Sequence, residues 1–294
     1  MNDNELLMGA KSGDRRNLSK LLSRIESGKF TFQKDSNVWA LGVTGPPGVG
    51  KSTLIGKLIQ QWTNAGEKVA VLAVDPSSPV SGGAILGDRL RMTNSDIGES
   101  VFVRSLATRN YPGGIIPKIS DMINLFSYCG WSRIIIETVG SGQSEIGIIA
   151  FADSILLVDG PDRGDIIQAE KAGIMEMADI IVVNKSDLPR AKVTADLIIE
   201  SLSLDSRELI PVLLTSALEN KGISDLVSCL DSLIPDKSRK NLRIRQILLS
   251  HWTSLVISNP IFDKIILDAS EGTKSISESI SSLMELFHDE VNHE

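Results

Sequence analysis

The segment GPPGVGKS, residues 45–52, has its glycines, lysine and hydroxyl spaced as in a phosphate-binding loop. It follows the strand-like run VWALGVT and precedes a helix-like run, which is the context that such a loop needs. The glycines let successive backbone N–H groups turn around phosphate oxygens, and the start of the helix adds its positive end. We expect Lys51 to neutralise the β- and γ-phosphates and Ser52 to offer its hydroxyl to Mg²⁺. The predicted phosphate-binding residues are Gly45, Pro46, Pro47, Gly48, Val49, Gly50, Lys51, Ser52 and Thr53.

A second motif, NKSD at residues 184–187, follows a buried-strand pattern and predicts the base of the nucleotide. The Asp187 carboxylate can accept hydrogen bonds from both the ring N–H and the amine of guanine, a pair of donors that adenine lacks. We expect the Lys185 stem to lie along the base and Asn184 to tie this loop to the phosphate loop. Ser216 and Ala217 end the run LIPVLLTSA, where the Ala217 N–H is expected to meet guanine O6. Together these residues predict a GTP site.

Acidic residues end two further apolar runs, Asp75 after VAVLAV and Glu137 after RIII. Because the carboxyl ends of parallel strands meet at one edge of a sheet, we expect both carboxylates to face Mg²⁺ and the γ-phosphate. Gly140, in the stretch ETVGSGQSE, is expected to present its N–H to the γ-phosphate. The sequence Asp-Pro-Ser-Ser is also good turn chemistry, so a purely capping role for Asp75 stays open.

These motifs lie in the middle of three zones. Residues 38–234 alternate short apolar runs with helical stretches, which predicts a P-loop NTPase domain of the α/β class, with a mostly parallel sheet flanked by helices. Residues 1–37 read as an N-terminal helical arm, and residues 235–294 as a C-terminal helical extension with apolar residues at helical spacing. We expect this extension to serve in dimerisation, although packing of its apolar stripes on their own domain stays open.

Composition argues against nucleic-acid-binding, membrane and secreted proteins. The net charge of −7 argues against general nucleic-acid or anionic-membrane binding, and no apolar run approaches the roughly 18 residues of a membrane span. The first residues lack the apolar core of a secretory signal, so we expect a cytoplasmic protein. The two cysteines, Cys129 and Cys229, are expected to be lone buried thiols.

Several segments together resemble one known family, the MeaB/ArgK-type GTPases, which include the methylmalonic aciduria type A proteins. The segments are GPPGVGKST, DPSSPVSGGAILGDRLRM, RSLATRNYPGG, ETVGSGQSE and NKSDL. The similarity covers about residues 4–230 well and the C-terminal helices more loosely. These GTPases accompany adenosylcobalamin-dependent acyl-CoA mutases, chiefly methylmalonyl-CoA mutase. The resemblance therefore implies a G-protein chaperone that couples GTP binding and hydrolysis to cobalamin loading, protection or reactivation of such a mutase.

The resemblance also implies roles for individual residues. It places Lys51, Asp75, Asp88 and Glu137 in catalysis of GTP hydrolysis, and Ser52 with the same three carboxylates around Mg²⁺. It implies a homodimer. A loop that couples the GTPase to its partner is expected at Pro161, Asp162, Arg163, Gly164 and Asp165.

That loop departs from the PGxGDE pattern of relatives, because Asp162 and Arg163 intervene and Ile166 replaces an acidic residue. The client therefore stays open among mutases for methylmalonyl-, isobutyryl-, hydroxyisobutyryl- and ethylmalonyl-CoA. Roles of Arg104 and Arg163 as arginine fingers stay open as well. Two other functions are alternatives. A P-loop kinase of a small molecule would not need NKSD, and a GTPase for metal insertion would need a Cys/His cluster with metal-ligand spacing, which the sequence lacks.

Overall fold

The computed structural model describes residues 2–32, 38–75, 98–107, 118–138, 151–161, 175, 177–204, 210–233 and 240–291. The chain divides into two compact units, Met1–Gln246 and Ile247–Glu294, which are described separately. The predictions for Asp88, Gly140, Asp162, Arg163, Gly164 and Asp165 fall outside the described residues, and of Asp75 only the backbone is described.

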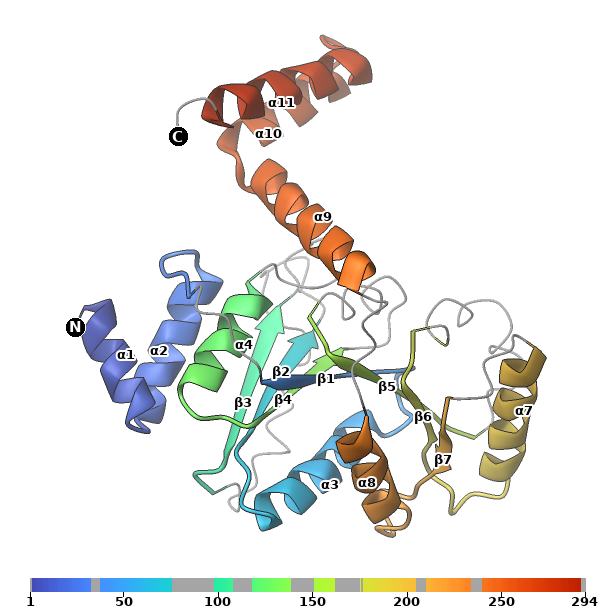
Figure 1. Ribbon diagram of the computed structural model, residues 1–294. Helices are drawn as coiled ribbons and strands as arrows, with labels where there is room; N and C mark the ends of the chain where they lie inside the picture. Colours follow the sequence, from blue (N-terminus) through green and yellow to red (C-terminus); the bar gives the residue numbers. More distant parts are fainter. Residues whose placement is uncertain are drawn as a thin grey trace. The chain divides into compact units, whose positions relative to one another are not determined.

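The first unit is built on a parallel sheet of seven strands in the order β3-β2-β4-β1-β5-β6-β7 (Figure 1). The strands are β1 (Trp39–Thr44), β2 (Val69–Asp75), β3 (Val101–Ala107), β4 (Arg133–Thr138), β5 (Ser154–Asp159), β6 (Ile180–Val183) and β7 (Val212–Leu214). The inner strands are buried along almost their whole length, because helices cover both faces. The parallel sheet predicted from the continuous apolar runs is confirmed.

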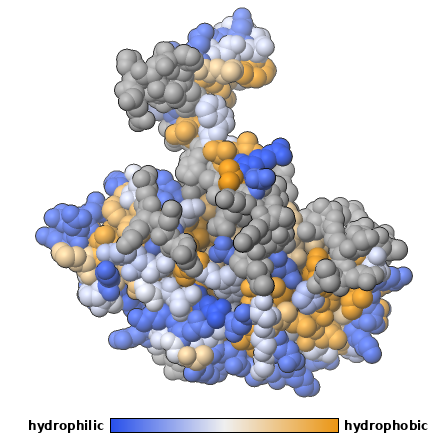
Figure 2. All heavy atoms as spheres, in the orientation of Figure 1, coloured by the Kyte–Doolittle hydropathy of each residue, from blue (hydrophilic) through white to orange (hydrophobic). Residues whose placement is uncertain are grey.

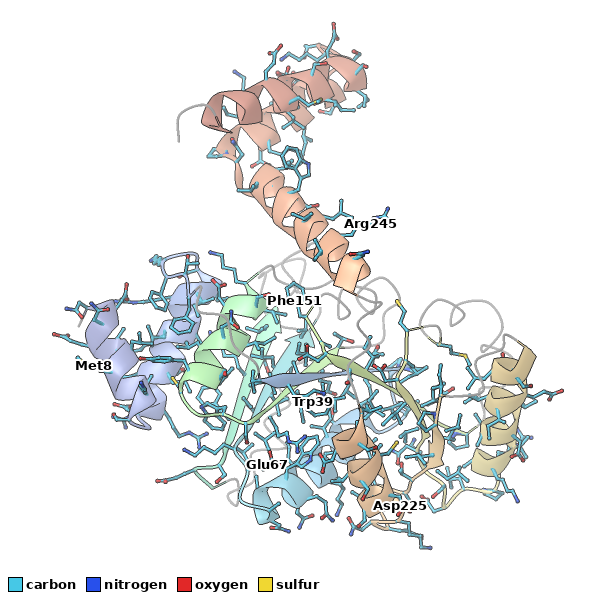
Figure 3. The ribbon with its side chains drawn as sticks, in the orientation of Figure 1. Met8, Trp39, Glu67, Phe151, Asp225 and Arg245 are labelled. Carbon is cyan, nitrogen blue, oxygen red and sulfur yellow. The ribbon has the colours of Figure 1, made fainter. Side chains whose placement is uncertain are left out.

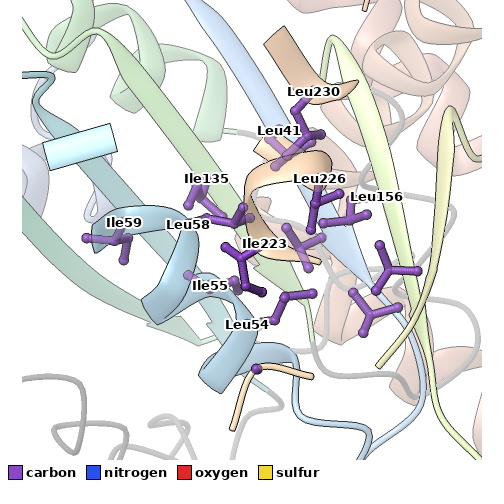
Figure 4. Packing of buried hydrophobic residues seen from close by; sticks show 14 of the residues in the cluster. Leu41, Leu54, Ile55, Leu58, Ile59, Ile135, Leu156, Ile223, Leu226 and Leu230 are labelled. Carbon is purple, nitrogen blue, oxygen red and sulfur yellow. The ribbon is translucent and has the colours of Figure 1, made fainter. Parts of the chain in front are cut away.

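One face of the sheet is covered by α3 (Lys51–Asn64) and α8 (Ile223–Ser232). Figure 4 shows their apolar side chains packed over the strands. The contributors from the helices include Leu54, Leu58, Ile223 and Leu226, and those from the strands include Leu41, Ile135 and Leu156.

The opposite face is covered by α4 (Ile119–Tyr128) and α7 (Ala191–Leu204). Successive side chains of a strand point to opposite faces. Phe102 of β3 packs on Phe126 of α4, with ring centres 5.4 Å apart, whereas its neighbours Val101 and Val103 join the α3 side. By the same alternation Leu157 of β5 packs with α7, while Leu156 packs with α3.

An N-terminal arm of two helices, α1 (Asp3–Lys11) and α2 (Arg15–Glu26), lies beside α4 (Figure 1) and is bonded to the edge strand β3. Arg15 Nη2 donates to the Val101 carbonyl at 2.6 Å, and Arg104 Nη2 donates to Glu26 Oε2 at 2.6 Å. The arm thereby gives the Val101 carbonyl of the edge strand a hydrogen-bond partner. Arg104, whose role the sequence left open, binds the arm in this structure.

At the amino ends of the strands, Arg133 of β4 links the sheet to α8. Its guanidinium donates to Glu67 at 2.7 Å and to Asp231 at 2.9 Å, and it stacks over Trp39 and Trp62. Trp39 and Glu67 are labelled in Figure 3. The Arg133 guanidinium lowers the pKa of the Glu67 carboxyl. This charged cluster is structural, since it lies at the sheet end away from the phosphate loop.

The second unit contains the end of α9 (Lys240–Ser258), followed by α10 (Pro260–Ser270) and α11 (Ile276–Val291). Asn259 accepts the Ile261 N–H and Pro260 occupies the first helical position, so a new helix starts there. The helices expose large apolar side chains, including Leu248, Trp252, Leu255, Ile276, Ile280 and Met284, some of which form the orange patches of Figure 2. None of the helices in the described parts of the chain is long and apolar enough to cross a membrane.

Candidate nucleotide site

The phosphate loop follows β1 and requires glycine at two positions for steric reasons. Gly45 has φ 139°, and a Cβ there would lie 1.9 Å from the Val158 carbonyl oxygen. Gly50 has φ 92°, and its Cβ would lie 2.5 Å from Asn184 Nδ2. Side chains are strained at such φ values and have no room here. The loop is therefore packed tightly against β5 and against the NKSD segment.

Lys51 is buried at the start of α3, inside the curve of the loop. Its Nζ donates to the carbonyls of Gly45 at 2.5 Å and Pro46 at 2.9 Å. Gly50, the residue that caps α3, gives the helix no side-chain cap. A buried ammonium and the first N–H groups of a helix together favour an anion, as the predicted phosphate contacts require.

Ser52 and Glu137 meet beside this loop. Ser52 Oγ donates to Glu137 Oε1 at 2.8 Å, and Glu137 is only 1% exposed. The register explains the contact, because β4 pairs directly with β1 and places Glu137 opposite Val43. Two residues that were predicted independently as metal ligands are thus neighbours.

The hydroxyl and carboxylate oxygens of Ser52 and Glu137 are the hard ligands that Mg²⁺ prefers, so these residues fit that ion. The backbone of Asp75 lies one strand further out, at the end of β2, where Val74 pairs with Thr138. Among the residues whose side chains are described, no group of three or more His, Cys, Asp or Glu could hold a metal. Because the side chains of Asp75 and Asp88 fall outside that set, their predicted roles stay predictions.

Asn184 connects the phosphate loop to the base loop through three hydrogen bonds. Its Nδ2 donates to the Val49 carbonyl at 2.9 Å, while its Oδ1 accepts from Thr215 Oγ1 at 3.2 Å and from the Ala217 N–H at 3.1 Å. The bond to Val49 connects Asn184 to the phosphate loop, as expected from the sequence. The Ala217 N–H, however, is donated to Asn184 in this structure, so its contact with guanine O6 stays a prediction.

A hydrogen bond and nearby lysines fix the carboxylate of Asp187, the residue predicted to select the base. Ser216 Oγ donates to Asp187 Oδ1 at 2.5 Å, and this bond, helped by Lys221 and Lys185, lowers the pKa of Asp187. Lys185 has a positive φ of 61°, which is uncommon outside glycine, and its Nζ donates to the Gly48 carbonyl at 2.7 Å. These contacts favour the ionised carboxylate and fix its position, as the predicted role of Asp187 in accepting two guanine donors requires.

One buried acid of this region was overlooked in the sequence. Asp159 ends β5, is 2% exposed, and accepts the Gly160 N–H at 2.9 Å through its own carboxylate. Its backbone carbonyl accepts the Asn184 N–H at 2.8 Å. An acid at the end of a buried run was the signal that pointed to Asp75 and Glu137, and the same signal was present here.

A phosphate loop opening α3, a buried carboxylate on the adjacent strand and an NKSD loop bonded to the phosphate loop define the class: the chain is a P-loop GTPase. It belongs to the MeaB family, whose model, described as methylmalonyl Co-A mutase-associated GTPase MeaB, matches residues 11–263.

Individual relatives agree with this assignment. A Pyrococcus abyssi protein whose name assigns it to the GTPases is 42% identical over 236 residues, covering 76% of this chain and 73% of that protein. The GTPase ArgK of Escherichia coli is 35% identical over 241 residues, covering 76% and 73%. The mitochondrial methylmalonic aciduria type A homolog of Caenorhabditis elegans is 37% identical over 207 residues, covering 68% of this chain and 52% of that protein.

The fold has a counterpart among solved structures. A crystal structure of a protein named LAO/AO transport system kinase superposes with a TM-score of 0.63 and 24% identity. The superposition covers 98% of this chain and 99% of that one. At this identity the likeness supports the fold alone.

Proposed function

We propose that this GTPase is a chaperone that assists cobalamin loading, protection or reactivation of an adenosylcobalamin-dependent acyl-CoA mutase. The observation that carries the proposal is membership of a family named for its association with methylmalonyl-CoA mutase. A relative named after methylmalonic aciduria adds support. The nucleotide site supplies the switch that such a role needs, because GTP binding and hydrolysis change the charge held beside Glu137 and the end of β5.

For hydrolysis, we assign the phosphate contacts to Lys51 and the metal-facing positions to Ser52, Asp75, Asp88 and Glu137. Mg²⁺, when bound, would neutralise charge on the β- and γ-phosphates. Positioning and charge stabilisation suffice for phosphoryl transfer, so no histidine base is required. This fits the sequence, whose three histidines all lie beyond residue 250.

We assign coupling to the client to the loop Pro161–Asp165, which begins two residues after Asp159 ends β5. In the described part of this region, Asp159 bonds to Gly160 and receives the Asn184 N–H. The start of the loop is thus attached to the same strand ends that hold the phosphate and base loops. Only Gly160 separates the end of β5 from this loop, so a change at the nucleotide can shift the loop through the backbone.

We also propose that the protein is a homodimer joined through the helices of residues 235–294. The support is the apolar surface of the second unit, where Trp252 is 50% and Ile276 is 69% exposed while Ile265 is a rare buried side chain. The residues of this unit whose burial is described enclose too little apolar surface to form a stable core alone. A second copy of the same helices would cover it. On this proposal residues 1–37 remain an arm and residues 38–234 the GTPase domain.

The test of the chaperone role is association with a mutase. The pure protein is incubated with candidate acyl-CoA mutases in GTP, in GDP and without nucleotide, and complexes are separated by gel filtration. A complex whose amount depends on the nucleotide supports the role. Absence of a complex with all candidate mutases in every nucleotide state refutes it.

The kinase alternative is tested separately. Phosphate release from GTP and not from ATP, with no phosphorylated small molecule, is the expected result. Transfer of the γ-phosphate to a small molecule would assign the protein to a different class.

A further inference from the structure

The outer face of α2 is basic in a chain that is acidic overall. The helix contains Arg15, Arg16, Lys20 and Arg24 against the single acid Glu26, while the whole chain has a net charge of −7. Arg16, Lys20 and Arg24 recur every four residues, so they follow one side of the helix over about 12 Å. Arg16 and Lys20 are exposed, and within the described residues neither makes an ion pair. Their charge is therefore available to a partner.

A groove of about 420 Å³ opens between α1 and α2 along this side of the arm. It is lined by Leu6, Ser19, Lys20, Ser23 and Arg24. Leu6, only 1% exposed, lies at the base of the groove. Lys20 and Arg24 supply cationic donors and Ser19 a hydroxyl, whereas the Ser23 hydroxyl already donates to the Ser19 carbonyl at 3.0 Å. An acidic side chain matches this lining, because its carboxylate can accept from Lys20 and Arg24.

The groove is held in shape by ion pairs at both sides. Arg24 pairs with Asp3, which joins α2 to α1. Arg104 of β3 donates to Ser23 Oγ at 3.1 Å and to Glu26 at 2.6 Å, which joins α2 to the sheet. A segment bound here would be fixed relative to β3 and the sheet.

We propose that the basic face of α2 and the adjoining groove form a docking surface for a glutamate- or aspartate-rich segment of a partner protein. The charge pattern favours a protein segment over nucleic acid or a membrane. The cations extend over only about 12 Å, and an extended polyanion would also meet the acidic remainder of the chain. The arm surface in Figure 2, at the left, is largely hydrophilic, which suits a reversible contact. That this partner is the client enzyme rests on the proposed function. The docking surface itself does not depend on the proposed function.

The test uses the full chain and a fluorescein-labelled glutamate-rich peptide, with binding followed by fluorescence anisotropy. The paired variant Arg16→Glu/Lys20→Glu is expected to bind the peptide at least about tenfold more weakly, because attraction becomes repulsion. The matched control is Lys192→Glu, an exposed lysine at the start of α7, which packs on β6 and β7 at the other edge of the sheet. The control is expected to bind within about twofold of the parent. Thermal unfolding and GTP hydrolysis of both variants are expected to match the parent, since none of the three residues belongs to the nucleotide site.

Four outcomes would overturn the docking surface. The first is equal weakening by Lys192→Glu, and the second is equal binding of a peptide with glutamine in place of glutamate. The third is stronger binding of single-stranded RNA or anionic vesicles with the same dependence on Arg16 and Lys20. The fourth is loss of self-association in the paired variant, measured by sedimentation, which would assign the face to a second copy. Peptide binding that persists when no mutase binds in any nucleotide state would refute the chaperone role and leave the docking surface standing.

Discussion

Removal of the Asn184 side chain tests whether one amide holds the phosphate and base loops together. In Asn184→Ala, the Val49 carbonyl, the Thr215 hydroxyl and the Ala217 N–H each lose a hydrogen bond, and all three residues are buried. A buried polar group left without a partner costs about 1–3 kcal/mol. Because water can enter the space and satisfy part of the loss, we expect the free energy of unfolding to fall by about 3 kcal/mol.

The assay is thermal unfolding followed by circular dichroism, without nucleotide. For a unit of this size, a loss of about 3 kcal/mol lowers Tm by about 6–12 °C. Thr215→Val is the matched control, because it removes only the 3.2 Å bond and leaves Asn184 bonded to Val49 and Ala217. The control should lose about 1 kcal/mol, and the double variant less than the sum of the two. A Tm within about 2 °C of the parent for Asn184→Ala, or strict additivity in the cycle, would show that this network does not join the loops.

Three further changes address the base, the chemistry and the thiols. Asp187→Asn should weaken GTP binding by about 100-fold or more and favour xanthine nucleotides, because the amide replaces one acceptor by a donor; unchanged selectivity in competition binding would refute the base assignment. Glu137→Gln keeps an acceptor for Ser52, so GTP should still bind while single-turnover hydrolysis falls by about 100-fold; hydrolysis at the parent rate would remove Glu137 from the mechanism. Burial raises the pKa of the Cys129 thiol from 9.0 to about 11, so the unfolded chain ionises first and stability should fall as pH rises from 9 to 11. Cys129→Ala should abolish that part of the pH dependence, and at neutral pH a thiol reagent should modify the half-buried Cys229 before Cys129.

The phosphate loop was predictable because its requirements are local. Positive φ at Gly45 and Gly50, a lysine at the first turn of α3 and a preceding buried strand all follow from a short stretch of sequence. The parallel sheet was predictable for a related reason, since strands buried on both faces need apolar residues at nearly every position. The contact of Ser52 with Glu137 follows once β4 is placed next to β1.

Other contacts depend on geometry that the sequence does not show. The bond from the Ala217 N–H to Asn184 competes with its predicted contact to the base, and only the folded loop shows where that hydrogen is directed. The position of the arm relative to β3 depends on the ion pair between Arg104 and Glu26, which are 78 residues apart in the chain. No local pattern predicts such a pair. Asp159 is a different case. It is an acid at the end of a buried apolar run, so the sequence pattern that points to Asp75 and Glu137 also predicts it.

The arm has a consequence for the solubility of shortened chains. β3 is an edge strand, and α2 is attached to it through Arg15, Arg104 and Glu26. A chain without residues 2–32 would keep every described residue of the nucleotide site but would lose these bonds to a seven-residue edge strand. Exposed edge strands can pair with one another between molecules. We therefore expect the shortened chain to aggregate more readily than the full chain.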